Sequence, residues 1–566
     1  MKRLAALIVL FLALPVAAAT RFEDLSYEEK LGQTLVVFVD VDSASQVRPA
    51  IEAGKIGGVL IQWGNYSLKQ TQQLVEKLQS WAAKSPHKIP LLISIDYEGG
   101  TVYTPITLGF DYLPTNMMLS AAQDEEGAAA IAYLAGLELR RAGVHINFSP
   151  VLDVNSNPHN PIIGVRSFGS DPANVTKMGL SLMNGFKAAG VISVVKHFPG
   201  HGDTSADSHY KVPVVKADYN ELQKIHLAPF AEAVRQEVPG VMTGHVMYPA
   251  LDGKNIATFS KPILHDLLRE KMGFKGFVVT DSLDMKSATS FCTIAGCAVR
   301  ALDSGADMIL LGRYIKPLTV FKQILQETQQ KKMQPRVEEA ARRIFEWKEK
   351  LGLLDGTIQT PAPIEQAYQA ALEKISNESV TLVRDRKGLL PFVPPQNKKG
   401  KPTVCAVFFA PSRFADQLMS FSKPFLEKGW KIRSYNAALT PRKKDSQRAA
   451  ECAKGADLLI LTSLQWADKT NINQKNAING LIKENKNTVF ISTMSPYDIK
   501  NYPEADVVLA TYGLNKYALQ TAAHIILGNL TPRGRLPVDL QLPPEPTSAS
   551  AGDERSKTHT PQAARK

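Results

Sequence analysis

The sequence predicts an α/β protein of two domains, a (β/α)8 barrel of the TIM type followed by a doubly wound α/β sandwich. Short, continuous apolar runs rich in β-branched residues alternate with amphipathic segments, as expected of parallel strands buried on both faces. The chain has 566 residues, which is more than one hydrophobic core organises. The expected parts are a signal peptide at 1–19, the barrel at 20–355, a linker at 356–374, the sandwich at 375–542 and a disordered tail at 543–566.

Eight apolar runs make up the first alternation. They lie at residues 35–39, 58–61, 91–95, 144–148, 191–195, 241–243, 277–280 and 308–311. Ser26 and Glu29 form a capping-box pair that predicts the first helix, and helical periodicity recurs at 71–83, 125–142 and 229–236. Eight strands with intervening helices are the count of a (β/α)8 barrel.

A second alternation follows a polar, proline-containing segment at 356–363. Its apolar runs lie at 404–409, 432–435, 458–462, 489–493 and 507–510, with helical segments between them. Five mostly parallel strands with helices on both faces predict a doubly wound sandwich. Beyond residue 543 the composition turns to Pro, Ser, Ala and mixed charge without periodicity, which is typical of disorder.

The N-terminus has the composition of a cleaved secretory signal. Two basic residues, Lys2 and Arg3, precede an apolar run at 4–14 and small residues at 15–20. The run is too short to span a bilayer, so we expect export to the periplasm or beyond, without a stable membrane span. The net charge of +12 would attract anionic polymers such as cell-wall material, or would serve only solubility. Nothing else favours nucleic-acid binding, and we expect a monomer.

Four cysteines are present, Cys292, Cys297, Cys405 and Cys452, without the C-x-x-C spacing of zinc or redox sites. In an oxidising compartment the first two could pair. If both lay on one helix, however, residues five apart would point to different faces. We therefore expect buried free thiols.

Polar residues follow several of the predicted barrel strands, where the loops of such a barrel form its active site. They are Asp96 and Glu98 after the third run, Asn147, Asp153, Asn155 and Arg166 in and after the fourth, Lys196 and His197 after the fifth, His245 after the sixth, and Asp281 and Ser282 after the seventh. A single Asp after a strand is usually a helix cap. Several polar groups at equivalent positions instead favour a catalytic site.

The loop at 196–209 allows two interpretations. Its His197, His201, Asp203 and His209 could bind a metal, because imidazoles and carboxylates are zinc ligands. Alternatively, Asp207 and His209 form a proton-transfer pair, in which the carboxylate orients the imidazole and favours its charged form. The spacing alone does not separate these possibilities.

Four motifs resemble glycoside hydrolase family 3. They are Asn-Phe-Ser-Pro-Val-Leu-Asp-Val-Asn at 147–155, Asn-Pro-Ile-Ile-Gly-Val-Arg-Ser-Phe-Gly at 160–169, Lys-His-Phe-Pro-Gly-His-Gly-Asp-Thr-Ser-Ala-Asp-Ser-His at 196–209, and Val-Val-Thr-Asp-Ser-Leu-Asp-Met at 278–285. They occur in order through almost the whole first domain. Within the family they resemble the β-N-acetylhexosaminidase branch that acts on bacterial cell-wall sugars. The second domain resembles, with weaker motifs, the sandwich of two-domain members.

The resemblance implies a role for each candidate residue. Asp281 would be the nucleophile of a retaining double displacement, His209 the general acid and then base, and Asp207 its partner. The residues implied to hold the sugar hydroxyls and acetamide are Asp96, Arg166, Lys196 and His197. No metal or cofactor is implied. The remaining polar groups have plainer interpretations: His201 and Asp203 shaping the loop, His245 and Asp153 as satisfied core residues, and Glu98 as structural.

The predicted function is therefore an exported exo-β-N-acetylglucosaminidase that releases terminal N-acetylglucosamine from peptidoglycan-derived fragments. Thr101 and Thr104 stand where family members usually carry arginines, which puts the leaving-group contacts in doubt. The alternatives are a β-glucosidase or β-xylosidase, whose acid/base generally comes from the second domain, a metal-dependent hydrolase, a non-catalytic wall-binding protein, and transfer to phosphate. Gly200 and Gly202 predict a mobile catalytic loop.

Overall fold

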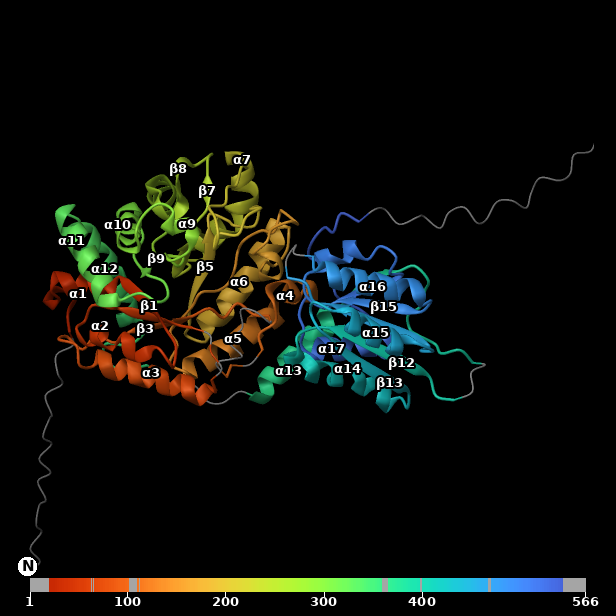
Figure 1. The fold of residues 1–566 in the computed structure, drawn as a ribbon. Helices are drawn as coiled ribbons and strands as arrows, with labels where there is room; N and C mark the ends of the chain where they lie inside the picture. Colours follow the sequence, from red (N-terminus) through yellow and green to blue (C-terminus); the bar gives the residue numbers. More distant parts are fainter. Residues whose placement is uncertain are drawn as a thin grey trace, which may run out of the picture.

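The computed structural model describes residues 20–62, 64, 66–100, 109–110, 112–358, 365–396, 400–466 and 470–542. The predicted signal peptide, the tail, and Thr101 and Thr104 lie outside these residues. The described chain forms two bodies side by side, a barrel drawn from red to green and a sandwich drawn from teal to blue (Figure 1). The predicted fold class is confirmed.

The first body is a closed parallel barrel. Its strands are β1 Leu35–Val39, β2 Gly58–Ile61, β3 Leu92–Ile95, β4 Ile146–Asn147, β5 Ile192–Phe198, β6 Gly240–Thr243, β9 Phe277–Thr280 and β10 Ile309–Leu310. They pair in the order β10-β1-β2-β3-β4-β5-β6-β9, and a parallel bridge between Val279 and Met308 closes the ring. All eight predicted runs thus form strands. Alternate strand residues such as Val36, Leu60 and Val194 fill the interior, as in other barrels of this type.

Helices cover the outside of the barrel. They are α1 Tyr27–Gln33, α2 Arg48–Glu52, α3 Leu68–Ala82, α5 Glu125–Arg141, α6 Pro172–Ala188, α8 Ala228–Arg235, α10 Ile294–Ser304, α11 Pro317–Gln330 and α12 Gln334–Lys350, with π-helical turns at Leu222–His226 and Pro262–Lys271. The predicted capping box is confirmed, because Ser26 and Glu29 cap α1 reciprocally. No helix of the described residues is long and apolar enough to cross a bilayer.

Two barrel features differ from the sequence prediction. Strand β5 continues through Lys196 and His197 to Phe198, because their side chains are buried against opposite charges and polar partners rather than turned to solvent. A hairpin of β7 Met247–Tyr248 and β8 Asp252–Ile256 follows β6. It was not predicted, because Asp-Gly-Lys-Asn-Ile lacks the apolar alternation of a half-buried strand.

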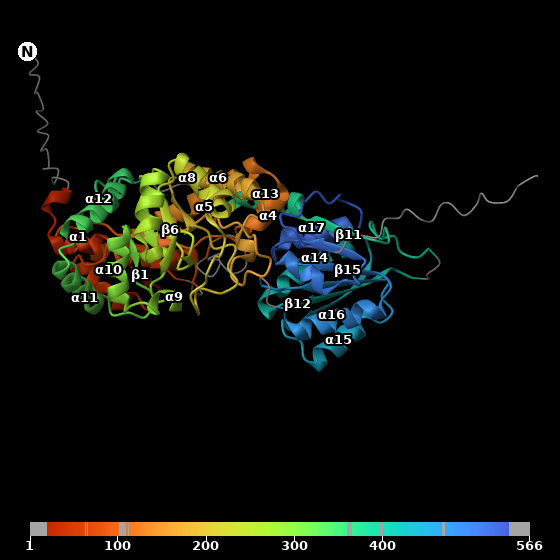
Figure 2. The ribbon, with the colours of Figure 1, turned by 90° about the horizontal axis from the view of Figure 1, so that it is seen from above.

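The second body is a six-stranded sheet between helices. Its strands are β11 Thr381–Asp385, β12 Thr403–Phe409, β13 Lys431–Ala437, β14 Leu458–Ser463, β15 Thr488–Ser492 and β16 Val507–Ala510, in the order β11-β16-β15-β14-β12-β13. α14 Ala415–Glu427 and α17 Lys516–Ile526 pack together on one face, and α15 Lys443–Ala453 and α16 Ile472–Glu484 on the other (Figure 2). The five predicted strands are parallel. The sixth, β11, was missed, being a half-buried edge strand antiparallel to β16.

The two bodies share a core. Helix α4 Asn116–Ala122 belongs to the barrel chain, yet its Met117 and Met118 are buried in the hydrophobic cluster of the sandwich. The hydroxyl of Thr115 donates to the carbonyl of Tyr512 at 2.9 Å, and the amide of Asn155 donates to the hydroxyl of Tyr497 at 2.9 Å. Helix α13 Glu365–Ser379 packs against α4, α5 and α17. The sandwich is therefore firmly fixed to the barrel.

The prediction of free thiols is wrong, because all four cysteines form disulfides. Cys292 lies before α10 rather than on it, which brings its Cα within 5.3 Å of that of Cys297. The second bond joins Cys405 on β12 to Cys452 on α15, whose Cα atoms are 5.7 Å apart although 47 residues separate them. The assumption that one helix carried both members of the first pair caused the error.

Candidate active site

A pocket of about 500 Å³ opens at the carboxyl ends of the barrel strands. It is lined by every residue predicted for the site: Asp96, Arg166, Lys196, His197, Asp207, His209 and Asp281. Among the described residues, all those that line it lie between positions 38 and 313, so the sandwich contributes none of them. Convergent polar groups in a concave site at this end of a barrel are typical of an active site.

The floor of the pocket is a network of buried ion pairs. Lys196 donates to Asp96 Oδ1 at 2.7 Å and lies 2.6 Å from Glu98 Oε1. Arg166 grips Glu98 with two parallel bonds, Nε to Oε2 at 2.7 Å and Nη2 to Oε1 at 2.9 Å. Glu98 therefore holds both cations that were predicted to bind sugar. The sequence held a signal for this role. Glu98 lies two residues after Asp96, just beyond the end of β3, and residues two apart in an extended chain point to the same side.

The network fixes the charges of the floor. Burial acts to raise the pKa of Glu98, but Arg166 and Lys196 outweigh it and lower that pKa to about 2. Burial opposes the charge of Lys196, whereas Asp96 and Glu98 raise its pKa above the ordinary value. These groups stay ionised at neutral pH. They suit the binding of hydroxyl groups rather than the transfer of protons.

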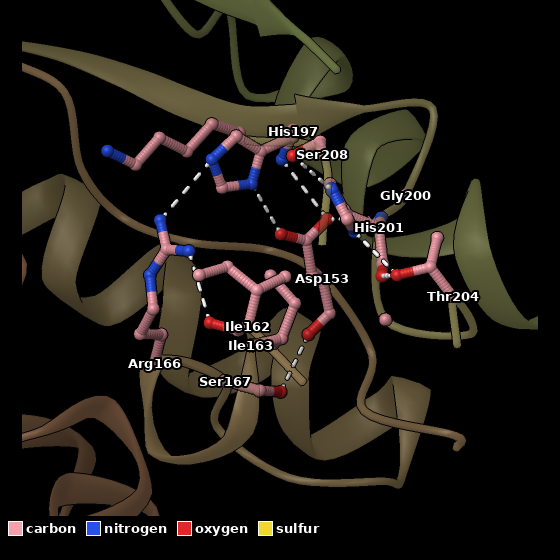
Figure 3. Close-up of polar contacts among 12 residues, drawn as sticks. Asp153, Ile162, Ile163, Arg166, Ser167, His197, Gly200, His201, Thr204 and Ser208 are labelled. Carbon is pink, nitrogen blue, oxygen red and sulfur yellow. Dashed lines mark hydrogen bonds and ion pairs between the residues drawn. The ribbon is translucent and has the colours of Figure 1, made fainter. Parts of the chain in front are cut away.

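Asp153 organises the two histidines at the start of the loop (Figure 3). Its Oδ2 lies 2.6 Å from Nδ1 of His197, and its Oδ1 accepts from the backbone N–H groups of His197 at 3.1 Å and His201 at 2.6 Å. Burial would raise the pKa of Asp153, but His197 and His201 hold it below the ordinary value. The carboxylate thus orients His197 with Nδ1 protonated.

His197 presents its other nitrogen toward Arg166. Nε2 of His197 lies 3.3 Å from Nη2 of Arg166, and a guanidinium can only donate in such a contact. With Nδ1–H directed to Asp153, Nε2 therefore acts as the acceptor. This second contact fixes the ring in the wall of the pocket.

His201 is engaged on both sides of its ring. Nδ1 lies 2.9 Å from the hydroxyl of Thr204, and Nε2 lies 3.1 Å from that of Ser208 (Figure 3). Burial, with the nearby His197, lowers the pKa of His201 to about 4, so the ring is neutral near pH 7. Among the described residues, no three His, Cys, Asp or Glu side chains are grouped to hold a metal ion. These contacts favour a loop-shaping role for His201 over metal ligation.

Asp207 and His209 form a pair at the mouth. Nδ1 of His209 lies 2.8 Å from Oδ1 of Asp207, and the same oxygen accepts from the backbone N–H of His209 at 2.9 Å. The side chain of His209 is half exposed, whereas that of Asp207 is largely covered. The imidazole thus lies at the pocket edge with Nε2 directed away from its carboxylate.

Asp281 follows β9 and lines the pocket as a half-buried side chain. The backbone N–H of Ser282 donates to its Oδ1 at 2.7 Å. Burial would raise the pKa of Asp281, but the imidazoles of His245 and His197 and the Ser282 N–H hold it below the ordinary value. His245 fixes this turn, since its Nε2 lies 3.0 Å from the carbonyl oxygen of Ser282. Asp281 is therefore an ionised carboxylate, and among the described residues no cation forms an ion pair with it.

The two glycines of the loop have a packing role. Gly200 has a φ of +129°, and a Cβ there would lie 2.8 Å from Cβ of His226. A Cβ on Gly202 would lie 1.7 Å from the carbonyl oxygen of Val154. The positive φ and the close approach explain Gly200, and the close approach explains Gly202. The predicted mobility of the loop stays a prediction.

These groups fit glycoside hydrolysis, in which one carboxylate faces the anomeric carbon and a second group protonates the leaving oxygen. Comparison with known proteins also indicates a glycoside hydrolase. The model of the glycosyl hydrolase family 3 N terminal domain matches residues 26–347, and that of the glycosyl hydrolase family 3 C-terminal domain matches residues 227–562. The chain belongs to glycosyl hydrolase family 3, which confirms the resemblance seen in its motifs, and it is a glycoside hydrolase.

Similar proteins span most of the chain. β-Hexosaminidase A of Pseudoalteromonas piscicida is 30% identical over 538 residues, which are 85% of this chain and 89% of that protein. A β-N-acetylglucosaminidase/β-glucosidase of Cellulomonas fimi is 26% identical over 92% of this chain and 95% of its own length. A solved family 3 β-N-acetylglucosaminidase from Paenibacillus sp. FPU-7 superimposes with a TM-score of 0.82 at 29% identity, covering 91% of this chain and 99% of that one.

Proposed function

We propose that the protein is a retaining exo-β-N-acetylhexosaminidase that removes terminal N-acetylglucosamine from peptidoglycan-derived fragments. The observation that carries this proposal is the pairing, in one pocket, of the ionised Asp281 with the Asp207–His209 dyad. The names of the similar proteins support the sugar. Among the described residues, only residues of the barrel line the pocket. This supports a β-N-acetylhexosaminidase over a β-glucosidase type that takes its acid/base from the second domain.

The reaction proceeds in two displacements. An oxygen of Asp281 bonds to the anomeric carbon as the bond to the leaving oxygen breaks, and protonated His209 gives that oxygen its proton. His209, now neutral, then takes a proton from water as the water oxygen attacks the anomeric carbon and releases Asp281. Asp207 orients the imidazole and stabilises its charged form in the first step.

The floor holds the sugar. Arg166 and Lys196, both paired with Glu98, offer charged donors, and Asp96 offers a charged acceptor. His197 lies beside Arg166. The pocket volume of about 500 Å³ suits a single sugar ring and its acetamide group. Cleavage would therefore occur at a chain end, with the leaving group outside the mouth.

The mouth carries groups for a leaving group that is both apolar and acidic. Tyr210 lines it next to His209 and is 74% exposed. Arg313 also lines the pocket, with its guanidinium 5.7 Å from the ring centre of Phe38 and its backbone N–H donating to Asp284 Oδ2 at 2.8 Å. An aromatic ring suits a sugar face, and a guanidinium suits a carboxylate. Both support a muramic-acid type of leaving group.

A panel of aryl glycosides tests the activity. The N-acetylglucosaminide should be cleaved faster than the glucoside and the xyloside, and the reverse order would contradict the proposal. The leaving group is tested with two disaccharides, N-acetylglucosamine β-1,4-linked to N-acetylmuramic acid or to N-acetylglucosamine. A higher kcat/KM for the acidic partner is expected. Equal values would mean that peptidoglycan fragments are not preferred.

Water is the acceptor, so product analysis in phosphate buffer should yield N-acetylglucosamine rather than its 1-phosphate.

The protein is exported, which the predicted signal peptide and the two disulfides support, since disulfides persist in oxidising compartments. Fractionation of the native host with an antibody to the protein tests the location.

A further inference from the structure

The second half of the catalytic loop is attached to the chain segment that follows Asp281. Backbone N–H groups of Lys286 and Ser287 donate to the carbonyl oxygens of His209 and Ser208, each at 3.3 Å. These donors are the first residues of α9 Lys286–Thr289, a helix of one turn. The N-cap residue of α9 is Met285, whose side chain does not cap it. The loop therefore accepts hydrogen bonds that the helix start would otherwise leave unmade.

The first half of the loop is held differently. The amide of Asn160 donates to the carbonyls of His201 at 2.9 Å and Gly202 at 3.1 Å, and that of Asn157 donates to the carbonyls of Asp203 and Thr204, both at 3.3 Å. Ser205 and its neighbours are then more exposed. The position of His209 thus depends on α9 and on the contact between Ser208 and His201.

A helix of one turn is not stable by itself, so α9 requires support from its surroundings. The disulfide between Cys292 and Cys297 joins the turn after α9 to the first turn of α10. The sulfur of Cys297 also lies 3.4 Å from the carbonyl oxygen of Ala288 in α9. Phe291 packs edge-on against Phe259, with their ring centres 6.1 Å apart, and this contact attaches the same turn a second time.

We propose that the Cys292–Cys297 disulfide is a positioning element for His209, acting through α9. The bond fixes the turn after α9, α9 fixes the carbonyls of Ser208 and His209, and these fix the imidazole that donates the proton. The inference rests on the proposed role of His209 as general acid. The bond also makes acid catalysis dependent on oxidation. Cys292 is its half-buried member, whereas Cys297 is fully buried.

The test is the dependence of kcat/KM on the leaving group. A 2,4-dinitrophenyl glycoside leaves without acid assistance, whereas a disaccharide requires a proton from His209. In the Cys292→Ala/Cys297→Ala variant, kcat/KM should fall about tenfold for N,N′-diacetylchitobiose and less than about twofold for the dinitrophenyl substrate, a partial loss because Phe291 still anchors the turn. The matched control is Cys405→Ala/Cys452→Ala, which removes the sandwich disulfide and should leave the ratio of the two values as in the wild type.

Reduction of the wild-type protein with dithiothreitol, with thiols at 292 and 297 verified by mass spectrometry, provides a second route that does not depend on folding of a variant. It should reproduce the selective loss. Equal losses on both substrates, or no loss, would overturn the inference. The His209→Ala variant separates the two proposals: if it shows no leaving-group selectivity, the role of His209 fails. If it does and the cysteine variant does not, only the inference fails.

Discussion

The carboxylate of Asp207 accepts two hydrogen bonds from His209, one from Nδ1 at 2.8 Å and one from the backbone N–H at 2.9 Å. The double contact fixes both the ring and the chain of the residue that carries it. Nε2 is the atom left to face a substrate. This geometry fits the proposed role of His209 as the proton donor.

Replacement of His209 should weaken catalysis in proportion to the basicity of the leaving group. We expect His209→Ala to lower kcat/KM by about 10²- to 10⁴-fold for poor leaving groups and far less for dinitrophenyl. Asp207→Asn should have the same pattern with smaller losses, because an amide can still accept from the ring. A series of aryl glycosides measures how steeply kcat/KM falls as the pKa of the leaving phenol rises. A loss that is uniform across the series would contradict proton donation by this pair.

Glu98→Gln should destabilise the barrel. The change leaves Arg166 and Lys196 with an uncharged partner in a buried site, a loss of about 3–5 kcal/mol at pH 7. The pKa of Glu98 is held at about 2, below its ordinary value near 4.5, so its contribution is full above pH 4.5 and is lost as the pH falls toward 2. Denaturant unfolding at several pH values measures the difference.

The matched control for Glu98 is Glu451→Gln, which changes an exposed glutamate of α15 and should leave the free energy of unfolding within about 0.5 kcal/mol. The difference between Glu98→Gln and the wild type should shrink below pH 4.5. A difference that stays constant down to pH 2.5 would show that lost packing, rather than lost charge, is responsible.

Lys348→Met should be as stable as the wild type or more stable at pH 6. Lys348 is buried, donating to Gln33 Oε1 at 2.6 Å and the Gly57 carbonyl at 2.9 Å, and among the described residues no carboxylate forms an ion pair with it. Burial lowers its pKa to about 7. Between pH 7 and 10.5 Lys348 is protonated in the unfolded chain but not in the folded one. The free energy of unfolding of the wild type therefore rises by about 1.4 kcal/mol per pH unit in this range.

The advantage of Lys348→Met should therefore diminish as the pH rises from 7 to 9, and denaturant unfolding at both values measures it. Lys350→Met changes an exposed lysine two residues further on α12 and should show no such dependence. A pH-independent difference between Lys348→Met and the wild type would contradict a buried, shifted ammonium group.

The sequence predicted the barrel well because strands such as β1 and β9 are buried on both faces and read as continuous apolar runs. The positions of Asp96 and Asp281 followed, since strand carboxyl ends meet at one face. Strand β11 was not predicted, because an edge strand with only two buried residues does not form a continuous apolar run.

Contacts between segments that are distant in the chain could not be predicted from the sequence. The pairing of Cys405 with Cys452 depends on how α15 packs on β12, and no local pattern encodes it. The grip of Glu98 on Arg166 joins residues 68 positions apart. The attachment of His209 to Lys286 likewise appears only when two loops meet.

The most direct test of the account is to trap the covalent intermediate. A fluorinated N-acetylglucosamine with a good leaving group should form the glycosyl-enzyme faster than water removes it. Intact mass spectrometry should then show one added sugar, and peptide mapping should place it on Asp281, with no adduct in Asp281→Asn. Labelling of another residue, or turnover of the reagent without an adduct, would contradict Asp281 as the nucleophile.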